Sequence, residues 1–304
     1  MERIEINCLK NLKKKINLFK TSIKDNNFII ISDFDYTLSK KYYNGKEMYS
    51  TYCFLEKSSI INQKNENFLK EINKLNHEYI PIESNYNIDF GFRKQKIKEW
   101  FIKALDLYVS QKFTKDEYNC MIEEVNQQEL SFVFREGIED FFKRLIKYEI
   151  PIVIISGGLK KPIDLMLRKI LDNYEQLKEE NKIIILANSF TFNNEGIVNG
   201  YSEPVIYTFN KENVIKDEIS KKYPKINKAF IMGDHLNDFD SIKRLNLDYN
   251  MIIGIGFINY INVLEEEILN DVIKNYKKIY DINIINGSFY PVIRLLDSIF
   301  EQNN

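Results

Sequence analysis

The sequence predicts an α/β protein, with a doubly wound, Rossmann-like parallel sheet as its core and an inserted, mainly helical cap domain. Three observations lead to this fold class. Short, continuously apolar runs are typical of strands that are buried on both faces. Helical patterns alternate with these runs, as they do in doubly wound sheets. The interval between the first two runs is much longer than a crossover connection requires.

Six short apolar runs are the candidate strands, and they lie at 28–32, 150–155, 183–187, 229–232, 251–255 and, more weakly, 282–285. Between the runs, apolar residues recur with the 3.6-residue period of a helix, as they do after Gly137. Pro162 and Pro291 each open a further helical pattern. Proline is well placed in the first turn of a helix, where its missing N–H needs no partner.

The long interval after the first strand has a different character. It contains no convincing parallel strand and instead has polar helical patterns at 65–78, 94–107 and 115–125. We therefore assign residues 1–40 and 134–304 to the α/β core and residues 41–133 to the cap domain.

Composition excludes several classes of protein. The 304 residues are 44% hydrophobic, which is enough for a sizeable core and excludes wholesale disorder. The net charge of −1 argues against a nucleic-acid polymer as partner, because such binders usually carry a basic excess. The 3 cysteines form no CxxC pair, so a disulfide scaffold or a structural zinc site is not expected, and a reducing, cytoplasmic location fits better.

The sequence also argues against a membrane partner. No run approaches the roughly 18 consecutive apolar residues that a membrane span needs. Ile4, Cys8, Leu12 and Ile16 recur at helical spacing with lysines between them, which predicts an amphipathic surface helix at the N-terminus. We expect a monomer.

Two aspartates, Asp33 and Asp35, follow the first predicted strand directly, in the hexapeptide DFDYTL at 33–38. Ligands of open α/β sheets bind beyond the carboxyl ends of the strands. Two carboxylates so close together are unfavourable unless a cation or a shared proton offsets their repulsion. Taken alone, this motif is better explained as a turn aspartate followed by a helix-capping aspartate.

A second acidic motif changes this interpretation. The segment GDHLND at 233–238 follows the strand at 229–232 and adds Asp234 and Asp238. Helix capping does not explain why both acidic motifs come after buried strands. Four acidic groups that meet at one edge of a sheet form a hard oxygen site suited to Mg²⁺.

Two further features can bind phosphate. Ser156 and Gly157, in the segment SGG at 156–158, follow the strand at 150–155 and precede a helix. A hydroxyl and free backbone N–H groups in this position can bind phosphate oxygens, although a plain glycine turn explains the segment equally well. Lys211, in FNK at 209–211, has no distinctive local signature.

In this order, DFDYTL, ISGG, FNK and GDHLND resemble the motifs of the haloacid dehalogenase superfamily of phosphohydrolases. The chain is more similar still to the pyrimidine 5′-nucleotidases, the cytosolic 5′-nucleotidase III family. Segments that resemble the motifs of that family lie at 33–39, 44–46, 79–83, 99–100, 135–137, 189–200 and 209–211. The resemblance runs from about residue 28 to the C-terminus.

The resemblance implies a role for each residue of these motifs. Asp33 would be the nucleophile that forms an aspartyl-phosphate, and Asp35 the general acid and base. Ser156, the amide of Gly157 and Lys211 would bind the phosphoryl oxygens. The implied metal site, for Mg²⁺, is formed by Asp33, Asp35 through its main-chain carbonyl, Asp234 and Asp238, the last of which would orient water on the metal or Lys211.

The resemblance also implies how the base is recognised. Glu83 matches the glutamate with which the family binds the base, either cytosine or 7-methylguanine. Trp100 offers a face on which a base can stack, although a buried aromatic of the cap core explains it at least as well. The family commonly has a serine where this chain has Ala104, and this difference affects base preference rather than phosphate chemistry.

These observations predict a Mg²⁺-dependent 5′-nucleotidase that hydrolyses pyrimidine nucleoside 5′-monophosphates such as UMP and CMP. Alternatives within the superfamily are a 7-methylguanosine monophosphate nucleotidase, a phosphatase of another small molecule such as phosphoserine or a sugar phosphate, and a nucleoside phosphotransferase. Two non-enzymatic alternatives are a receiver domain, which would be much shorter and lack a large cap, and an inactive nucleotide-binding relative, which the full set of catalytic residue types argues against.

Overall fold

A computed structural model describes residues 3–22, 27–83, 85, 87–128, 131–242, 251–259 and 266–301. Its elements follow one another as β1 (Arg3–Ile6), α1 (Leu9–Ser22), β2 (Phe28–Ser32), β3 (Tyr42–Tyr43), β4 (Lys46–Glu47), α2 (Cys53–Glu56), α3 (Ser59–Lys64), α4 (Phe68–Glu83), α5 (Phe90–Ser110), α6 (Lys115–Asn126), α7 (Ile138–Lys147), β5 (Ile152–Leu159), α8 (Lys160–Ile170), α9 (Tyr174–Glu179), β6 (Ile183–Asn188), β7 (Phe190–Phe192), β8 (Val198–Tyr201), α10 (Lys211–Lys222), β9 (Lys228–Gly233), α11 (Leu236–Ile242), β10 (Ile252–Ile258), α12 (Glu266–Ile279), β11 (Ile282–Ile285) and α13 (Tyr290–Phe300).

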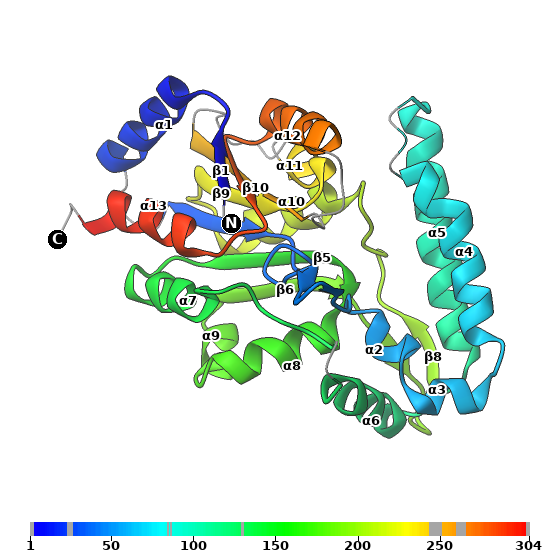
Figure 1. The fold of residues 1–304 in the computed structure, drawn as a ribbon. Coiled ribbons are helices and arrows are strands. Elements are labelled where there is room, and N and C mark those ends of the chain that lie inside the picture. Colours follow the sequence, from blue (N-terminus) through cyan, green and yellow to red (C-terminus); the bar gives the residue numbers. More distant parts are fainter. Residues whose placement is uncertain are drawn as a thin grey trace.

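The central sheet has seven strands in the order β1-β11-β10-β9-β2-β5-β6 (Figure 1). All neighbouring strands are parallel except β1, which pairs with β11 in the antiparallel direction. The six strands predicted from apolar runs are β2, β5, β6, β9, β10 and β11. The predicted fold class is therefore confirmed.

The two faces of the sheet are covered by different helices (Figure 1). Side chains of a strand point alternately to opposite faces. In β2, Ile30 therefore packs with α1, α7 and α13 on one face, whereas Ile29 and Ile31 pack with α10 and α11 on the other. Burial on both faces is why these strands are continuously apolar rather than alternating.

The N-terminus corrects one prediction. Residues 3–6 form a strand, and Ile4 pairs with Ile284 of β11, so the helix begins only at Leu9. The spacing of Ile4, Cys8, Leu12 and Ile16 suggested one continuous helix, but the unpaired edge of β11 offers backbone partners that a local pattern cannot reveal. Leu12 is buried against the sheet, whereas Cys8 is exposed.

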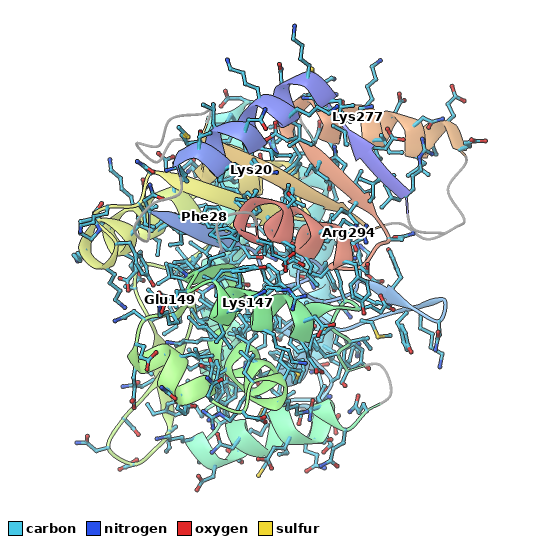
Figure 2. The ribbon with its side chains drawn as sticks, turned by 90° about the vertical axis from the view of Figure 1, so that its left-hand side faces the viewer. Lys20, Phe28, Lys147, Glu149, Lys277 and Arg294 are labelled. Carbon is cyan, nitrogen blue, oxygen red and sulfur yellow. The ribbon has the colours of Figure 1, made fainter. Side chains whose placement is uncertain are left out.

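Aromatic side chains connect α1 to the strands of the sheet. Phe19 of α1 packs against Phe28 at a ring distance of 5.6 Å, and Phe28 packs against Phe230 of β9 at 4.9 Å. Figure 2 shows Phe28 on the side of the molecule that also bears Lys20 and Arg294. No helix in the described ranges is long and apolar enough to cross a membrane.

Helices α2 to α6 all come from the long interval after β2. Among them, α4 and α5 lie side by side at one end of the sheet (Figure 1). The hairpin β7–β8 packs on this group of helices, because Tyr201 donates a hydrogen bond to Asp106 of α5 at 2.9 Å and Thr114 forms a β-bridge with Ile197. The boundaries of core and cap given above stay a prediction.

Candidate active site

The two aspartates of DFDYTL lie in a tight turn after β2. The N–H of Asp33 donates to the carbonyl of Met232 at 3.0 Å, which continues the pairing of β2 with β9 beyond the strand. Tyr36 then adopts a φ of +64°, a conformation that is unfavourable for a residue other than glycine. Its N–H donates to Ser39 Oγ at 2.8 Å.

A buried arginine holds this turn in place. The guanidinium of Arg135 donates to the carbonyls of Tyr36 and Thr37 at 2.7 and 2.8 Å. It also donates to the carbonyl of Gly287 and to Asn259 Oδ1, at 2.8 and 2.6 Å. Burial lowers the pKa of Arg135 to about 10, so the group remains charged at neutral pH. The turn after β2 is thus tied through Arg135 to Gly287 and Asn259, which are distant in the sequence.

Three carboxylates converge where β2 and β9 end. Oxygens of Asp33, Asp234 and Asp238 all lie within 4.8 Å of one another. The ammonium of Lys211, the first residue of α10, donates to Asp33 Oδ1 at 2.6 Å and to Asp238 Oδ1 at 2.7 Å. Among the described residues, the Lys211 ammonium is the cation hydrogen-bonded to this cluster of three carboxylates, so the ionised cluster carries a net negative charge.

The pKa values of these groups reflect burial and crowding. Burial, opposed by the charge of Lys211 and reinforced by that of Asp238, raises the pKa of Asp33 to about 6. The pKa of Asp234 is raised well above its usual value by burial and then by the charges of Asp33 and Asp238. Burial lowers the pKa of Lys211, but the two carboxylates outweigh it and raise the pKa on balance.

Asp35 lies beside these carboxylates but has its own partner. The hydroxyl and the N–H of Thr51 donate to its two oxygens at 2.7 and 3.0 Å. Burial, opposed by the Thr51 hydrogen bond, raises the pKa of Asp35 to about 7. Gly158 leaves room for this pair, because a Cβ at that position would lie 2.0 Å from Thr51 Oγ1.

The serine and glycines of SGG belong to the end of β5, which extends to Leu159, rather than to a separate turn. Ser156 Oγ accepts the N–H of Gly158 at 2.9 Å. The carbonyl of Gly157 accepts from Tyr52 at 3.0 Å and from Asn188 at 2.7 Å. These hydrogen bonds fix the backbone of the segment that resembles a phosphate-binding motif.

A cleft of about 260 Å³ brings most of the predicted site residues together. Those that line it are Asp33, Asp35, Glu83, Ser156, Gly157, Lys211, Asp234 and Asp238. These residues lie after β2, within β5, at the start of α10, after β9, in the first turn of α11 and at the end of α4. Proximity in space thus links motifs that lie up to about 200 residues apart in the sequence.

Glu83, the last residue of α4, lines the same cleft as the aspartates. Its carboxylate accepts a short hydrogen bond from the hydroxyl of Thr208, which also lines the cleft. Its carbonyl accepts from Arg93 of α5 at 2.7 Å. Thr208, in the segment before α10, thus holds the carboxylate of Glu83, and Arg93 of α5 holds its main chain.

Trp100 does not line the cleft. Its ring is stacked on Tyr79 at 6.4 Å with an interplanar angle of 1°, and the next residue, Phe101, lines the cleft instead. The prediction that Trp100 stacks on a base therefore stays a prediction without a contact to support it. Ala104, which replaces the family's serine, is a half-buried residue packed against the core.

Several residues of the cleft were not predicted. Thr51, Tyr52, Phe101 and Thr208 contact or face the site residues, but nothing in the local sequence distinguishes them. Thr208 and Phe101 had a nearby signal, because Thr208 precedes the FNK segment and Phe101 follows the segment 99–100. His235 also lines the cleft.

The family model described as "Pyrimidine 5′-nucleotidase (UMPH-1)" matches residues 36–300, which is most of the chain. The chain belongs to the pyrimidine 5′-nucleotidase family. The resemblance inferred from the ordered motifs is thereby confirmed. Like the other pyrimidine 5′-nucleotidases, it is an enzyme of the 5′-nucleotidase class, a phosphoric monoester hydrolase.

Curated relatives of this pyrimidine 5′-nucleotidase have a more specific name. The human 7-methylguanosine phosphate-specific 5′-nucleotidase is 32% identical over 234 residues, which are 76% of this chain and 72% of that protein. The 7-methylguanosine phosphate-specific 5′-nucleotidase B of Xenopus laevis is 27% identical over 266 residues, 87% of this chain and 84% of that protein.

A solved structure has the same fold. It is cytosolic 5′-nucleotidase IIIB bound to cytidine, with a TM-score of 0.78 and 23% sequence identity. The match covers 99% of this chain and 94% of that one. The sheet and its helical insertion are therefore those of a known 5′-nucleotidase fold.

Proposed function

We propose that the protein is a Mg²⁺-dependent 5′-nucleotidase that hydrolyses pyrimidine nucleoside 5′-monophosphates, UMP and CMP, to a nucleoside and phosphate through an aspartyl-phosphate on Asp33. The observation that carries the proposal is the cleft itself. In it, Lys211 donates a hydrogen bond to Asp33, Asp35 lies beside them with Thr51 as its partner, and Glu83 lines the same cleft. Such a cleft accommodates a phosphate at one end and a base at the other.

The donor set fits a divalent cation. The three clustered carboxylates are hard oxygen ligands. Burial and then their mutual repulsion raise the pKa of Asp234, and a bound cation would relieve that repulsion. Asp33, the main-chain carbonyl of Asp35, Asp234 and Asp238 would hold Mg²⁺. When bound, the ion neutralises phosphate charge, which allows an anionic carboxylate to attack an anionic ester.

The first chemical step forms a bond between an oxygen of Asp33 and phosphorus. The pKa of about 6 leaves this carboxylate mostly ionised at pH 7, as a nucleophile must be. Lys211, whose ammonium lies 2.6 Å from Asp33 Oδ1, reaches phosphoryl oxygens that approach this carboxylate. Ser156 and the amide of Gly157 would bind the same oxygens from the other side of the cleft.

Asp35 supplies and recovers the proton. With a pKa raised to about 7, its carboxyl holds a proton in a large fraction of molecules near neutral pH. It gives that proton to the ribose 5′-oxygen as the ester bond breaks, and the nucleoside leaves. Asp35 then takes a proton from the water that attacks the aspartyl-phosphate, which releases phosphate and restores Asp33.

Glu83 is the proposed contact to the base. An ionised carboxylate can accept a hydrogen bond from the exocyclic amine of cytosine or from the ring N–H of uracil. Thr208 donates to this carboxylate and Arg93 to the main-chain carbonyl of Glu83. Phe101 lines the same cleft, where its ring offers a stacking surface. Glu83 therefore governs the choice of substrate rather than the chemistry at phosphorus.

A second substrate has specific support. Both curated relatives compared above are named for 7-methylguanosine phosphate, and Glu83 can equally accept from the polarised ring of 7-methylguanine. A 7-methylguanosine monophosphate nucleotidase is therefore the alternative. Only the base end of the cleft differs between the two proposals.

A nucleotide panel tests both proposals. Phosphate release is measured from UMP, CMP, 7-methyl-GMP and phosphoserine, each with Mg²⁺ and with EDTA. The proposal expects the highest kcat/KM on UMP or CMP and no turnover in EDTA. A preference for 7-methyl-GMP would replace the substrate, and release from phosphoserine alone would reject a nucleotidase. Added nucleoside as acceptor distinguishes phosphotransfer from hydrolysis.

Two variants separate chemistry from recognition. Asp33→Asn is expected to abolish turnover of every substrate, because it removes the nucleophile. Glu83→Gln is expected to lower kcat/KM on the preferred nucleotide by about tenfold, with little effect on a phosphate ester that lacks a base. Turnover retained by Asp33→Asn would exclude the aspartyl-phosphate.

We also propose that the protein is a monomer and that it is located in the cytoplasm. Light scattering tests the oligomeric state, and cell fractionation tests the location.

A further inference from the structure

A second cavity, of about 480 Å³, lies outside the active site between α6, α8 and β7. Figure 1 shows α6 and α8 at the end of the molecule below the sheet, where the chain of α6 approaches α8. The two cavities share none of their lining residues. The mechanism above uses no group in this second cavity.

The lining of this cavity is strongly basic. Its cations are Lys115, Lys160, Lys161, Arg168 and Lys178, and its acidic residues are Asp164 and Glu123. Lys178 is paired with Asp164 at 2.8 Å and Arg168 with Glu175 at 2.5 Å. By contrast, Lys115, Lys160 and Lys161 form no ion pair within the described part of the chain. The cavity thus presents unneutralised positive charge.

The placement of two of these lysines is electrostatically unfavourable. Lys160 and Lys161 occupy the first turn of α8, which has no acidic residue there and no capping side chain. Cations at a helix N-terminus oppose the helix dipole, and an anion at that end would be stabilised. Burial and then the charges of Lys115 and Arg168 lower the pKa of Lys161.

Two buried polar atoms also lack partners at this cavity. The side chain of Tyr118 is only 3% exposed, and its hydroxyl has no hydrogen-bond partner among the described residues. Asn119 Oδ1 is likewise buried without a partner. Both residues line the cavity. Unsatisfied buried polar atoms are costly, so a ligand that satisfies them gains their hydrogen bonds.

The remaining lining is apolar and aromatic. Tyr118 packs edge-on against Phe190 at 5.5 Å, and Phe192, Ile122 and Leu165 complete the surface. A ligand for such a cavity combines several negative charges with a flat apolar part. Its volume falls within the range of sites that bind molecules of nucleotide size.

We propose that this cavity is a second nucleotide site, which binds a nucleoside polyphosphate without hydrolysing it. Lys115, Lys160 and Lys161 hold the phosphates at the start of α8, and the Tyr118 hydroxyl donates to one phosphate oxygen. The base lies against the aromatic side chains of β7 and α6. A nucleotide bound here bridges α6, from the predicted cap, and α8, from the predicted core.

The test is calorimetric titration of the whole protein with ATP in EDTA, where the proposed metal-dependent turnover cannot occur. The wild type is expected to bind ATP saturably. Lys115→Gln/Lys161→Gln is expected to weaken binding at least about tenfold, because hydrogen bonds to charged groups are lost. Lys169→Gln is the matched control, since Lys169 is exposed on the same helix and does not line the cavity.

Tyr118→Phe gives a second, sharper readout. Removal of the hydroxyl is expected to weaken ATP binding by about two- to tenfold. Because this hydroxyl has no partner in the free protein, the melting temperature without ATP is expected to stay equal or to rise. A purely structural role for the hydroxyl would instead lower the melting temperature, and this would overturn the proposal.

Further outcomes decide the ligand. Pyrophosphate is expected to bind more weakly than ATP, because it lacks the base. Equal binding of the two would overturn the assignment of a nucleotide. Absence of saturable ATP binding, or unchanged binding by Lys115→Gln/Lys161→Gln, would overturn the site. Because no arm depends on phosphate release, failure here is distinct from failure of the proposed nucleotidase activity.

Discussion

Lys211 is 4% exposed and lies between Asp33 and Asp238, at 2.6 and 2.7 Å. A buried lysine is costly unless its charge is compensated, and here two carboxylates compensate it. The same geometry makes its ammonium available to a phosphate that approaches Asp33. The proposed role of Lys211 therefore depends on the carboxylates around it rather than on any feature of the local sequence.

Lys211→Gln is expected to lower kcat by about 100- to 1000-fold, because a charged donor to the phosphoryl oxygens is lost. Asp33 and Asp238 would also lose the ammonium that donates to both of them, so a lower melting temperature is expected. Steady-state kinetics and thermal unfolding measure both effects. Lys216→Gln is the control, since Lys216 is exposed on the same helix. Near-normal kcat in Lys211→Gln would remove Lys211 from the mechanism.

At the scale of elements, the end of β5 is packed against Asp35, the proposed general acid. A Cβ at Gly158 would lie 2.0 Å from Thr51 Oγ1 and 2.7 Å from Asp35 Oδ2. The strand therefore needs a glycine at this position because of close approach.

Gly158→Ala is expected to separate Thr51 from Asp35 and to destabilise the fold by about 1–3 kcal/mol, as overpacking does. We expect kcat to fall at least about tenfold. Gly196→Ala is the comparison: its φ of +74° makes alanine strained, but nothing lies within 4 Å of the added Cβ. It is expected to lose stability and keep its kcat. Equal kcat values for the two variants would contradict the packing argument.

Another contact between elements predicts a pH dependence. Glu124 of α6 accepts from Ser58 Oγ at 2.5 Å and from the N–H of Ser59 at 2.9 Å, where α3 begins. Burial alone would raise the pKa of Glu124, but these hydrogen bonds lower it below its usual value of 4.5. A lowered pKa in the folded state means that the ionised form stabilises the fold.

Glu124→Gln is expected to reduce the free energy of unfolding at pH 7 by about 0.5–1 kcal/mol. The deficit is fully present above pH 4.5, the usual value for glutamate, and is lost as the pH falls through the lower pKa of the folded state. Urea unfolding of both proteins from pH 7 to pH 3 measures it. A deficit that does not change with pH would show that the charge of Glu124 is not involved.

For the molecule as a whole, stability is expected to depend on the divalent cation. A ligand that binds only the folded state stabilises it by about 2.7 kcal/mol at a concentration 100 times its Kd. Mg²⁺ is therefore expected to raise the melting temperature of the wild type. Asp234→Asn is expected to be at least as stable without Mg²⁺, since it relieves repulsion, and to show a smaller shift. An identical Mg²⁺ response in both proteins would contradict the proposed ligand set.

Local sequence predicted the interior of the sheet well. The strands β2, β5, β6, β9, β10 and β11 are each apolar on both faces, so their own residues reveal them. The sequence also predicted that the aspartates after β2 and β9 lie close together, because parallel strands bring their carboxyl ends to one edge of the sheet. Adding the ordered motifs was enough to indicate the family and most of the residues now found in one cleft.

The features that the sequence did not predict were decided by contacts between distant segments. Arg3–Ile6 is a strand only because β11 offers a free edge, and Trp100 is stacked on Tyr79 while Phe101 faces the cleft. Thr51 and Thr208 likewise acquire their partners by folding. The local sequence determines the residue types and the periodicity of the strands. Edge pairing, side-chain direction and buried hydrogen bonds instead depend on which surfaces the folded chain brings together.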